Sequence, residues 1–156
     1  NVRQLSYYVD TSVWNFLLEH DRPERQQATA RFFQQVGSQG GLAISEVVTR
    51  EIERAPVQRR VALEQLLKQY QPEILDVTAE VDALAQRYIT ERLIPPRYRD
   101  DALHLATAVV HERDLLVSWN FDHLVKLKTR VGVNAVNKLV GYREIEIVSP
   151  EEVDVT

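Results

Sequence analysis

Acidic residues stand just after segments of this chain that look like buried β-strands. Asp10 follows the apolar segment Leu5–Val9, and Ser45 follows Leu42–Ile44, with Glu51 six positions further on. A charged residue that directly follows an apolar strand is unusual, so Asp10 is the strongest single candidate for a functional acid. Ser45 is a natural N-cap for the helix that would carry Glu51.

A second polar group surrounds another predicted strand, Leu115–Val117. Asn120 and Asp122 follow this strand, and Asp100 and Asp101 open the helix that leads into it. In an open parallel sheet, ligands bind beyond the carboxyl ends of the strands. We therefore expect these acidic groups to meet at one edge of the sheet.

Metal binding would explain why several carboxylates gather at one edge of the sheet. Crowded carboxylates repel one another and stay ionised together only with a cation between them. Mg²⁺ and Mn²⁺ prefer oxygen ligands, and they can activate water and stabilise the leaving oxygen of a phosphodiester. The same acids also fit structural roles: Asp10 as a cap, Asp100 and Asp101 near a helix dipole, Glu51 on a solvated face.

The elements that would position these residues alternate between strands and helices. Further strands are expected at Ile74–Val77 and Ile145–Val148. Helices are expected after Asp10, over 23–36, 45–52, 57–70, 78–89 and 99–112, and briefly over 121–128, whereas 131–139 is ambiguous. This alternation predicts an α/β fold with a central parallel sheet of about five strands and helices on both faces. No linker divides the chain, so residues 1–156 are expected to form a single domain.

The composition excludes several kinds of site. The chain has 156 residues, 44% of them hydrophobic, and no cysteine, so disulfides and thiolate-held zinc or iron are excluded. The net charge of −4 argues against a general basic coat for nucleic acid, although the region after Ser118 is locally basic. No apolar run could cross a membrane and no secretion signal is recognisable, so we expect a cytoplasmic protein with no membrane partner.

Four segments of the chain resemble PIN-domain proteins, particularly bacterial toxin nucleases of VapC type. The segments are Tyr8–Ser12, Ser45 with Glu51, Asp101–Ala108 and Leu116–Asp122, in the order of the family's motifs. The resemblance extends from Leu5 to Val153. In the fourth segment the family commonly has an aspartate where this chain has Asn120, a departure that resembles one PIN subgroup. Asn120 offers a carbonyl oxygen but no charge.

The resemblance implies a PIN-like three-layer α/β/α fold and a Mg²⁺- or Mn²⁺-dependent endoribonuclease. The implied catalytic residues are Asp10, Glu51, Asp101 and Asn120, and the implied metal ligands are Asp10, Glu51, Asp101 and Asp122. Thr11, Ser12, Ser45 and Asp100 would orient these ligands. The family also implies an RNA substrate, a homodimer and an antitoxin protein as partner.

Further residues each allow two interpretations. Candidate RNA contacts are Arg97, Arg99, Lys126, Lys128 and Arg130, which also fit ion pairs or solvated helix faces. His104 lies one helical turn after Asp101 and could reach the site, but a surface or partly packed histidine is the more ordinary expectation. Trp14 and Trp119 are expected in the core or a dimer interface, and one of Phe32 and Phe33 is expected to face outward.

Two other functions remain open. A catalytically weak or inactive PIN module that binds RNA or a protein is suggested by Asn120, which removes one charge from the expected site. A different Mg²⁺-dependent phosphohydrolase on a similar sheet would turn over small phosphate esters but not RNA.

Overall fold

A computed structural model describes residues 4–153, and the strands in this range form one parallel sheet. The strands are β1 (Tyr7–Val9), β2 (Leu42–Ser45), β3 (Glu73–Leu75), β4 (Leu115–Val117) and β5 (Glu146–Val148). Their order across the sheet is β3-β2-β1-β4-β5. Every neighbouring pair is parallel, so all carboxyl ends lie at the same edge.

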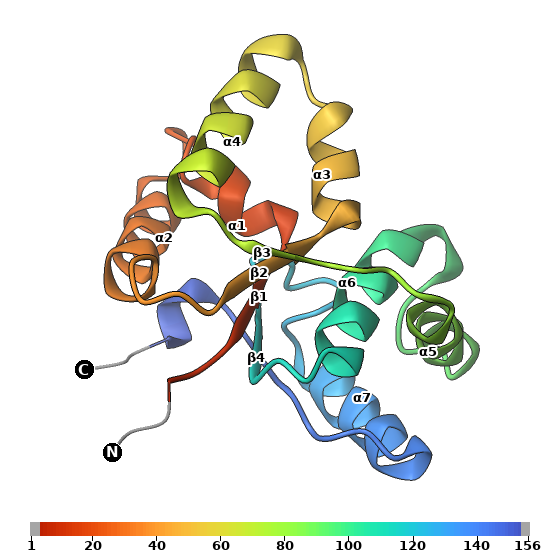
Figure 1. Cartoon of the computed structure of the whole chain (residues 1–156). Helices are drawn as coiled ribbons and strands as arrows, with labels where there is room; N and C mark the ends of the chain where they lie inside the picture. Colours follow the sequence, from red (N-terminus) through yellow and green to blue (C-terminus); the bar gives the residue numbers. More distant parts are fainter. Residues whose placement is uncertain (1–3, 154–156) are drawn as a thin grey trace.

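Helices cover both faces of this sheet. They are α1 (Thr11–Phe16), α2 (Pro23–Val36), α3 (Glu46–Glu53), α4 (Val57–Tyr70), α5 (Ala79–Thr90), α6 (Arg99–Val110) and α7 (Leu127–Val140). Two short 3₁₀ helices are η1 (Pro96–Tyr98) and η2 (Pro150–Glu152). In Figure 1, α1 and α2 lie on one side of the sheet and α5, α6 and α7 on the other, while α3 and α4 form a hairpin at the β2–β3 end. The predicted three-layer α/β/α architecture is confirmed.

The strands form because short β-branched and aromatic runs are buried on both faces. Tyr8, Val9, Ile44 and Leu116 are fully buried, as strands between two helical layers must be. Trp14 and Trp119 are also buried, as predicted for core positions. The prediction that Phe32 or Phe33 faces outward is wrong. Both rings are buried, because they pack edge-on against each other within the aromatic cluster that α2 forms.

The segment after β4 differs from the prediction. A short helix was expected over 121–128, but the chain makes turns there and α7 begins only at Leu127. The side-chain oxygen of Asn120 caps a turn, accepting hydrogen bonds from the backbone N–H groups of Asp122 and His123. The turn is not continued into a helix, because the N–H groups of Leu124 and Val125 both donate to the carbonyl oxygen of Asn120. The ambiguous segment 131–139 belongs to α7.

No helix in the part of the chain that the structure describes is long and apolar enough to cross a membrane.

Candidate active site

Asp10 lies at the point where β1 ends and α1 begins. It is 3% exposed and caps α1, because Oδ1 accepts hydrogen bonds from the backbone N–H (3.1 Å) and hydroxyl (2.5 Å) of Ser12. Its other oxygen, Oδ2, accepts from the Ser118 hydroxyl at 2.6 Å. All three donors are neutral, so the carboxylate is held in place without an ion pair to lysine or arginine.

The loop after β4 is fastened to the same two serines. The backbone N–H of Trp119 donates to the Ser12 hydroxyl at 2.9 Å, and that of Asn120 donates to the Ser118 hydroxyl at 2.9 Å. This loop is therefore fixed relative to Asp10 by hydrogen bonds that use no charged group. Sequence analysis did not assign Ser118, although its place directly after a buried strand could have indicated it.

Glu51 is carried by α3, which begins after Ser45 as predicted, with the Ser45 hydroxyl accepting from the N–H of Val47. Glu51 Oε1 accepts a hydrogen bond from the Thr11 hydroxyl at 2.7 Å and lies 2.6 Å from Nε2 of His104. Three elements, α1, α3 and α6, thus meet at a single carboxylate oxygen.

His104 is 2% exposed, so it is not the surface or partly packed residue that was expected. Its Nδ1 lies 2.7 Å from the hydroxyl of Tyr8, which lies 2.8 Å from the hydroxyl of Ser45. If the ring is neutral and protonated on Nε2, Ser45 donates to Tyr8, Tyr8 donates to Nδ1, and Nε2–H donates to Glu51. A buried, fully satisfied chain of hydrogen bonds therefore ends on Glu51. Tyr8 was part of a recognised motif but received no role from the sequence.

Asp101 lies in the first turn of α6 and is the third acid of the group, partly buried like Glu51. Its Oδ2 accepts from the Asn120 side-chain amide at 3.1 Å and lies 3.2 Å from Nδ1 of His123. Its neighbour Asp100 points elsewhere and forms ion pairs with Arg50 and Arg54 at 3.5 and 3.7 Å. Successive residues of a helix are rotated by about 100°, which separates the two aspartates into different surroundings.

The three carboxylates influence one another electrostatically. Burial is the main reason why the pKa of Asp10 is raised, and the charge of Glu51 adds to the effect. Burial likewise raises the pKa of Asp101, and the charges of Asp10 and Glu51 contribute.

Glu51 and His104 shift each other's pKa toward the charged forms, against the effect of burial. Burial opposes ionisation of Glu51, but its hydrogen bond and attraction to His104 prevail, so the pKa of Glu51 is lowered. Burial also opposes a charge on His104, and the bond to Glu51 prevails there too, so the pKa of His104 is raised.

The model of one protein family matches residues 7–125 and is described as PIN domain. This chain belongs to the PIN domain family. The match covers all four acidic or amide positions at the carboxyl edge of the sheet: Asp10, Glu51, Asp101 and Asn120. The subgroup suggested by Asn120 stays a prediction.

Solved structures of VapBC proteins share this PIN fold. VapBC2 from Rickettsia felis, bound to a DNA fragment from its promoter, is 16% identical with a TM-score of 0.59 over 93% of this chain and 98% of that one. DNA-bound VapBC from Salmonella typhimurium is 14% identical with a TM-score of 0.58, over 94% and 99%. Mycobacterium tuberculosis VapC20, described as a sarcin–ricin loop cleaving toxin, is 17% identical with a TM-score of 0.55, over 90% and 99%. At these identities the likeness shows the fold. A search among curated proteins found no match.

The donor set of this PIN domain has the chemistry that a magnesium or manganese ion requires. Asp10, Glu51 and Asp101 offer oxygen ligands from three elements at one edge of the sheet, close enough to shift one another's pKa. In the conformation described for residues 4–153, however, no three His, Asp or Glu side chains converge closely enough to hold an ion. His104 and His123 contact one oxygen of Glu51 and one of Asp101, so a bound ion would use the remaining oxygens once the carboxylates move closer together.

Asp122 lies outside this group of acids. Its side chain is exposed, and the hydrogen bond recorded for it joins its backbone N–H to Asn120. The prediction that it binds metal remains untested.

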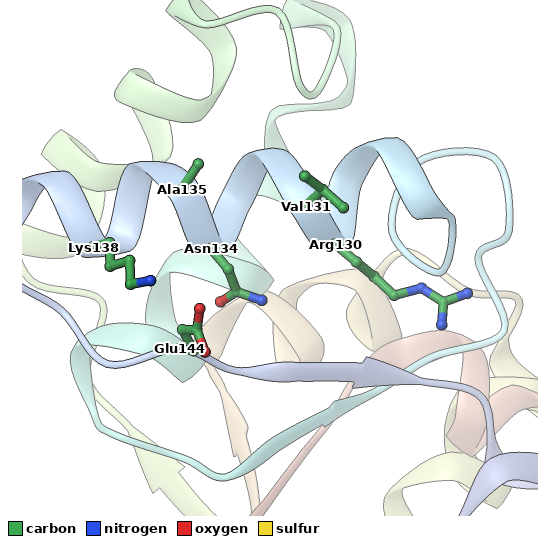
Figure 2. A pocket seen from close by; sticks show the side chains of 6 residues that line it. All are labelled: Arg130, Val131, Asn134, Ala135, Lys138 and Glu144. Carbon is green, nitrogen blue, oxygen red and sulfur yellow. The ribbon is translucent and has the colours of Figure 1, made fainter.

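The predicted RNA contacts lie on different elements. Arg99 pairs with Asp82 of α5, and Arg130 pairs with Glu152 of η2. Arg97 lies over the ring of Tyr98, next to α6. Lys126 precedes α7 and Lys128 is exposed in its first turn. A groove of about 470 Å³ runs along α7 and is lined by Arg130, Val131, Asn134, Ala135, Lys138 and Glu144 (Figure 2). Asp10, Glu51 and Asp101 do not line this groove.

Proposed function

We propose that this PIN domain is a Mg²⁺- or Mn²⁺-dependent endoribonuclease of VapC toxin type. The observation that carries the proposal is the gathering of Asp10, Glu51 and Asp101 at the carboxyl edge, buried or partly buried and without an ion pair to lysine or arginine among residues 4–153. Such an arrangement is costly without a cation. The PIN family and the fold shared with a toxin that cleaves the sarcin–ricin loop support the same activity.

Asp10, Glu51 and Asp101 would hold the ion in this proposal. When bound, it would supply an activated water and would stabilise negative charge on the leaving oxygen of the phosphodiester. Ser12 and Ser118 keep Asp10 at the end of β1 through their hydroxyl groups. Thr11 fixes Glu51 in the same way.

His104 and Asn120 position two of the carboxylates. The chain from Ser45 through Tyr8 to His104 orients one oxygen of Glu51 and leaves the other free to accept a ligand. The Asn120 amide orients Asp101, and its carbonyl oxygen is already used by the turn that follows. Asn120 therefore acts in this structure as a positioning residue and adds no charge.

An antitoxin partner and a homodimer are also part of the proposal. The related folds from Rickettsia felis and Salmonella typhimurium were solved as VapBC proteins on DNA, which supports an antitoxin for this chain. Cleavage of RNA would take place in the cytoplasm.

The experiment is an RNA cleavage assay that compares two acids of α3. Total bacterial RNA would be incubated with the purified protein and Mn²⁺, or with EDTA. Glu51→Gln should lower cleavage about a thousandfold, equivalent to ~4 kcal/mol of transition-state stabilisation. Glu53→Gln is the control, because Glu53 is exposed on the same helix, and it should stay within threefold of wild type.

Cleavage that persists in EDTA, or equal activity in Glu51→Gln, would contradict the proposal. A wild-type protein that binds RNA but does not cleave it in Mn²⁺ would favour the second candidate, a non-catalytic PIN module. The observation that favours this alternative is the occupation of Glu51 by His104 and of Asp101 by His123 and Asn120.

A further inference from the structure

Arg25 is held against three aromatic rings beside the acidic cluster. Its guanidinium carbon lies 5.1 Å from the ring centres of Trp119 and Phe121 and 5.6 Å from that of Phe16. Within residues 4–153 it forms no ion pair and no side-chain hydrogen bond, whereas Arg50, Arg54, Arg99 and Arg130 all pair with acids. Its N–H groups are oriented by the rings and remain available to an anion.

The exposure of Phe121 is unusual for an aromatic ring that only stabilises the fold. Its side chain is 39% exposed, although a large apolar ring gains by being buried. It directly follows Asn120, whose amide donates to Asp101, so a single residue separates an exposed ring from the acidic cluster. An exposed ring next to an unpaired guanidinium suits a nucleobase and its phosphate together.

A second arginine stacks on an aromatic ring near the same acids. Arg97 is exposed and lies 5.1 Å above the ring of Tyr98, which stacks on His123 with ring centres 3.9 Å apart. His123 in turn contacts Asp101. Arg25 belongs to α2 on one side of the sheet, and Arg97 precedes α6, which lies on the other (Figure 1). Both stacks include a residue of the loop after β4, Phe121 in the first and His123 in the second, so this loop joins them at Asp101.

We propose that Arg25 with Phe121 binds one nucleotide, and Arg97 a further phosphate, of a single-stranded RNA segment at the acidic cluster. The inference rests on the proposed function and names residues that bind its substrate. The guanidinium groups contact backbone phosphates, and the exposed ring of Phe121 receives a base, whereas the ring of Tyr98 is already covered by Arg97 and His123. Because bases within a duplex are already stacked on each other, only an unpaired segment can use the Phe121 ring. Arg25 and Phe121 are therefore specificity-determining residues for unpaired RNA.

The test measures RNA binding in EDTA, where metal-dependent cleavage does not interfere. The probes are a fluorescein-labelled, unstructured oligoribonucleotide of about 10 nucleotides and a hairpin duplex of similar length. Arg25→Ala should weaken binding of the single strand about tenfold and lower the slope of log K against log salt by about 0.7, the value for one phosphate contact. Arg97→Ala should act in the same direction.

The Phe121→Ala variant distinguishes the contribution of base stacking to RNA binding from the contribution of charge. It should weaken single-strand binding about tenfold and leave the salt slope unchanged, because it removes a ring and no charge. Phe121→Tyr should bind like wild type. Arg25→Lys keeps the charge but loses the planar contact, so it should retain the salt slope and lose affinity. Arg31→Ala, at an exposed arginine of the same helix, is the control and should change neither quantity.

Wild-type affinity in both Arg25→Ala and Phe121→Ala would overturn the inference, as would equal binding of the hairpin duplex. Melting temperatures of all variants identify any that fail to fold. If an alanine variant fails to fold, the results for Arg25→Lys and Phe121→Tyr decide the outcome. The proposed function is judged separately by Mn²⁺-dependent cleavage. Cleavage with no effect of these variants would overturn only the inference on RNA binding.

Discussion

At the amino edge of the sheet, carboxylates meet matched donors. Asp114 accepts a hydrogen bond from the backbone N–H of Ser6 at 2.8 Å and one from its hydroxyl at 3.1 Å. Glu73 forms an ion pair with Arg113 at 2.5 Å. These contacts join β1, β3 and β4 where the strands begin, and Arg113 compensates the charge of Glu73.

The acidic side chains at the carboxyl edge of the same sheet have different partners. Asp10, Glu51 and Asp101 are held by hydroxyl, amide and imidazole groups, and none of them forms an ion pair with lysine or arginine within the described range. The contrast is repeated between sequence neighbours, because Asp100 has two arginine partners and Asp101 has none. One edge is arranged for stability, and the other keeps its negative charge available, as a functional site requires.

The largest effect should separate the two neighbouring aspartates. Asp101→Asn should lower Mn²⁺-dependent RNA cleavage about a thousandfold, because it removes a proposed metal ligand. Asp100→Asn should lower it less than threefold, because it only loosens partly exposed ion pairs with Arg50 and Arg54. Initial rates of both variants on the same RNA provide the measurement. Equal losses in the two variants would show that the contrast between the two surroundings has no bearing on function.

The hydrogen-bond chain behind Glu51 gives the next largest effect. His104→Leu removes one of the two hydrogen-bond partners of the Tyr8 hydroxyl and one of the two partners of Glu51 Oε1, and it should weaken Mn²⁺ binding about 10–100-fold. His104→Gln can still donate to Glu51 and should recover most of the affinity. Calorimetric titration of Mn²⁺, together with melting temperatures, checks both variants. If Leu and Gln behave alike at equal stability, His104 does not position Glu51.

Asn120→Asp tests the one position where the expected charge is missing. A carboxylate there faces Asp101, so the metal-free protein should lose stability through repulsion while Mn²⁺ binding tightens about tenfold. The two changes have opposite signs, and melting curves with and without Mn²⁺ measure both. A variant that is less stable than wild type both without and with Mn²⁺ would mean that the Asn120 amide is needed for the loop alone.

The smallest expected effect concerns stability without metal. Burial raises the pKa of Asp10, so the folded chain binds a proton there more tightly than the unfolded chain, and stability falls as pH rises through the raised pKa. Asp10→Asn removes this cost and keeps a good helix cap, so it should raise the melting temperature at pH 7 by about 2–4 °C.

This gain should shrink as the pH is lowered toward about 4, where the aspartate is itself protonated. Glu73→Gln at the amino edge is the comparison and should change the melting temperature by less than about 2 °C, since the Glu73 side chain is largely exposed. A lower melting temperature for Asp10→Asn at pH 7 would contradict the account of Asp10.

The fold could be predicted from the sequence because its signals are local. Strands end at Asp10 and Ser45, and each of these residues caps the following helix as its residue type indicates. The segment after Asn120 was mispredicted as a helix, because a capped turn begins there but its next N–H groups, of Leu124 and Val125, return to the carbonyl oxygen of Asn120. Whether a capped turn continues into a helix is not visible in hydrophobic periodicity.

The acids of the site were predicted from the sequence, but the hydrogen bonds that hold them were not. The position of Glu51 relative to Ser45 follows from helix spacing, whereas its contact with His104 joins residues 53 positions apart in the sequence. The roles of Tyr8 and Ser118 likewise depend on which strands are neighbours in the sheet. The ring stack around Arg25 brings together α1, α2 and the loop after β4, and no pattern within one of these segments indicates it.

The central claim is that the acids at the carboxyl edge form one divalent-cation site. The most direct measurement is a calorimetric titration of Mn²⁺ into the metal-free wild type and into Asp10→Asn. We predict that the wild type binds Mn²⁺ and that the variant binds at least about 10–100-fold more weakly, because it lacks a ligand from the end of β1. No binding to the wild type, or equal binding to both proteins, would contradict the account.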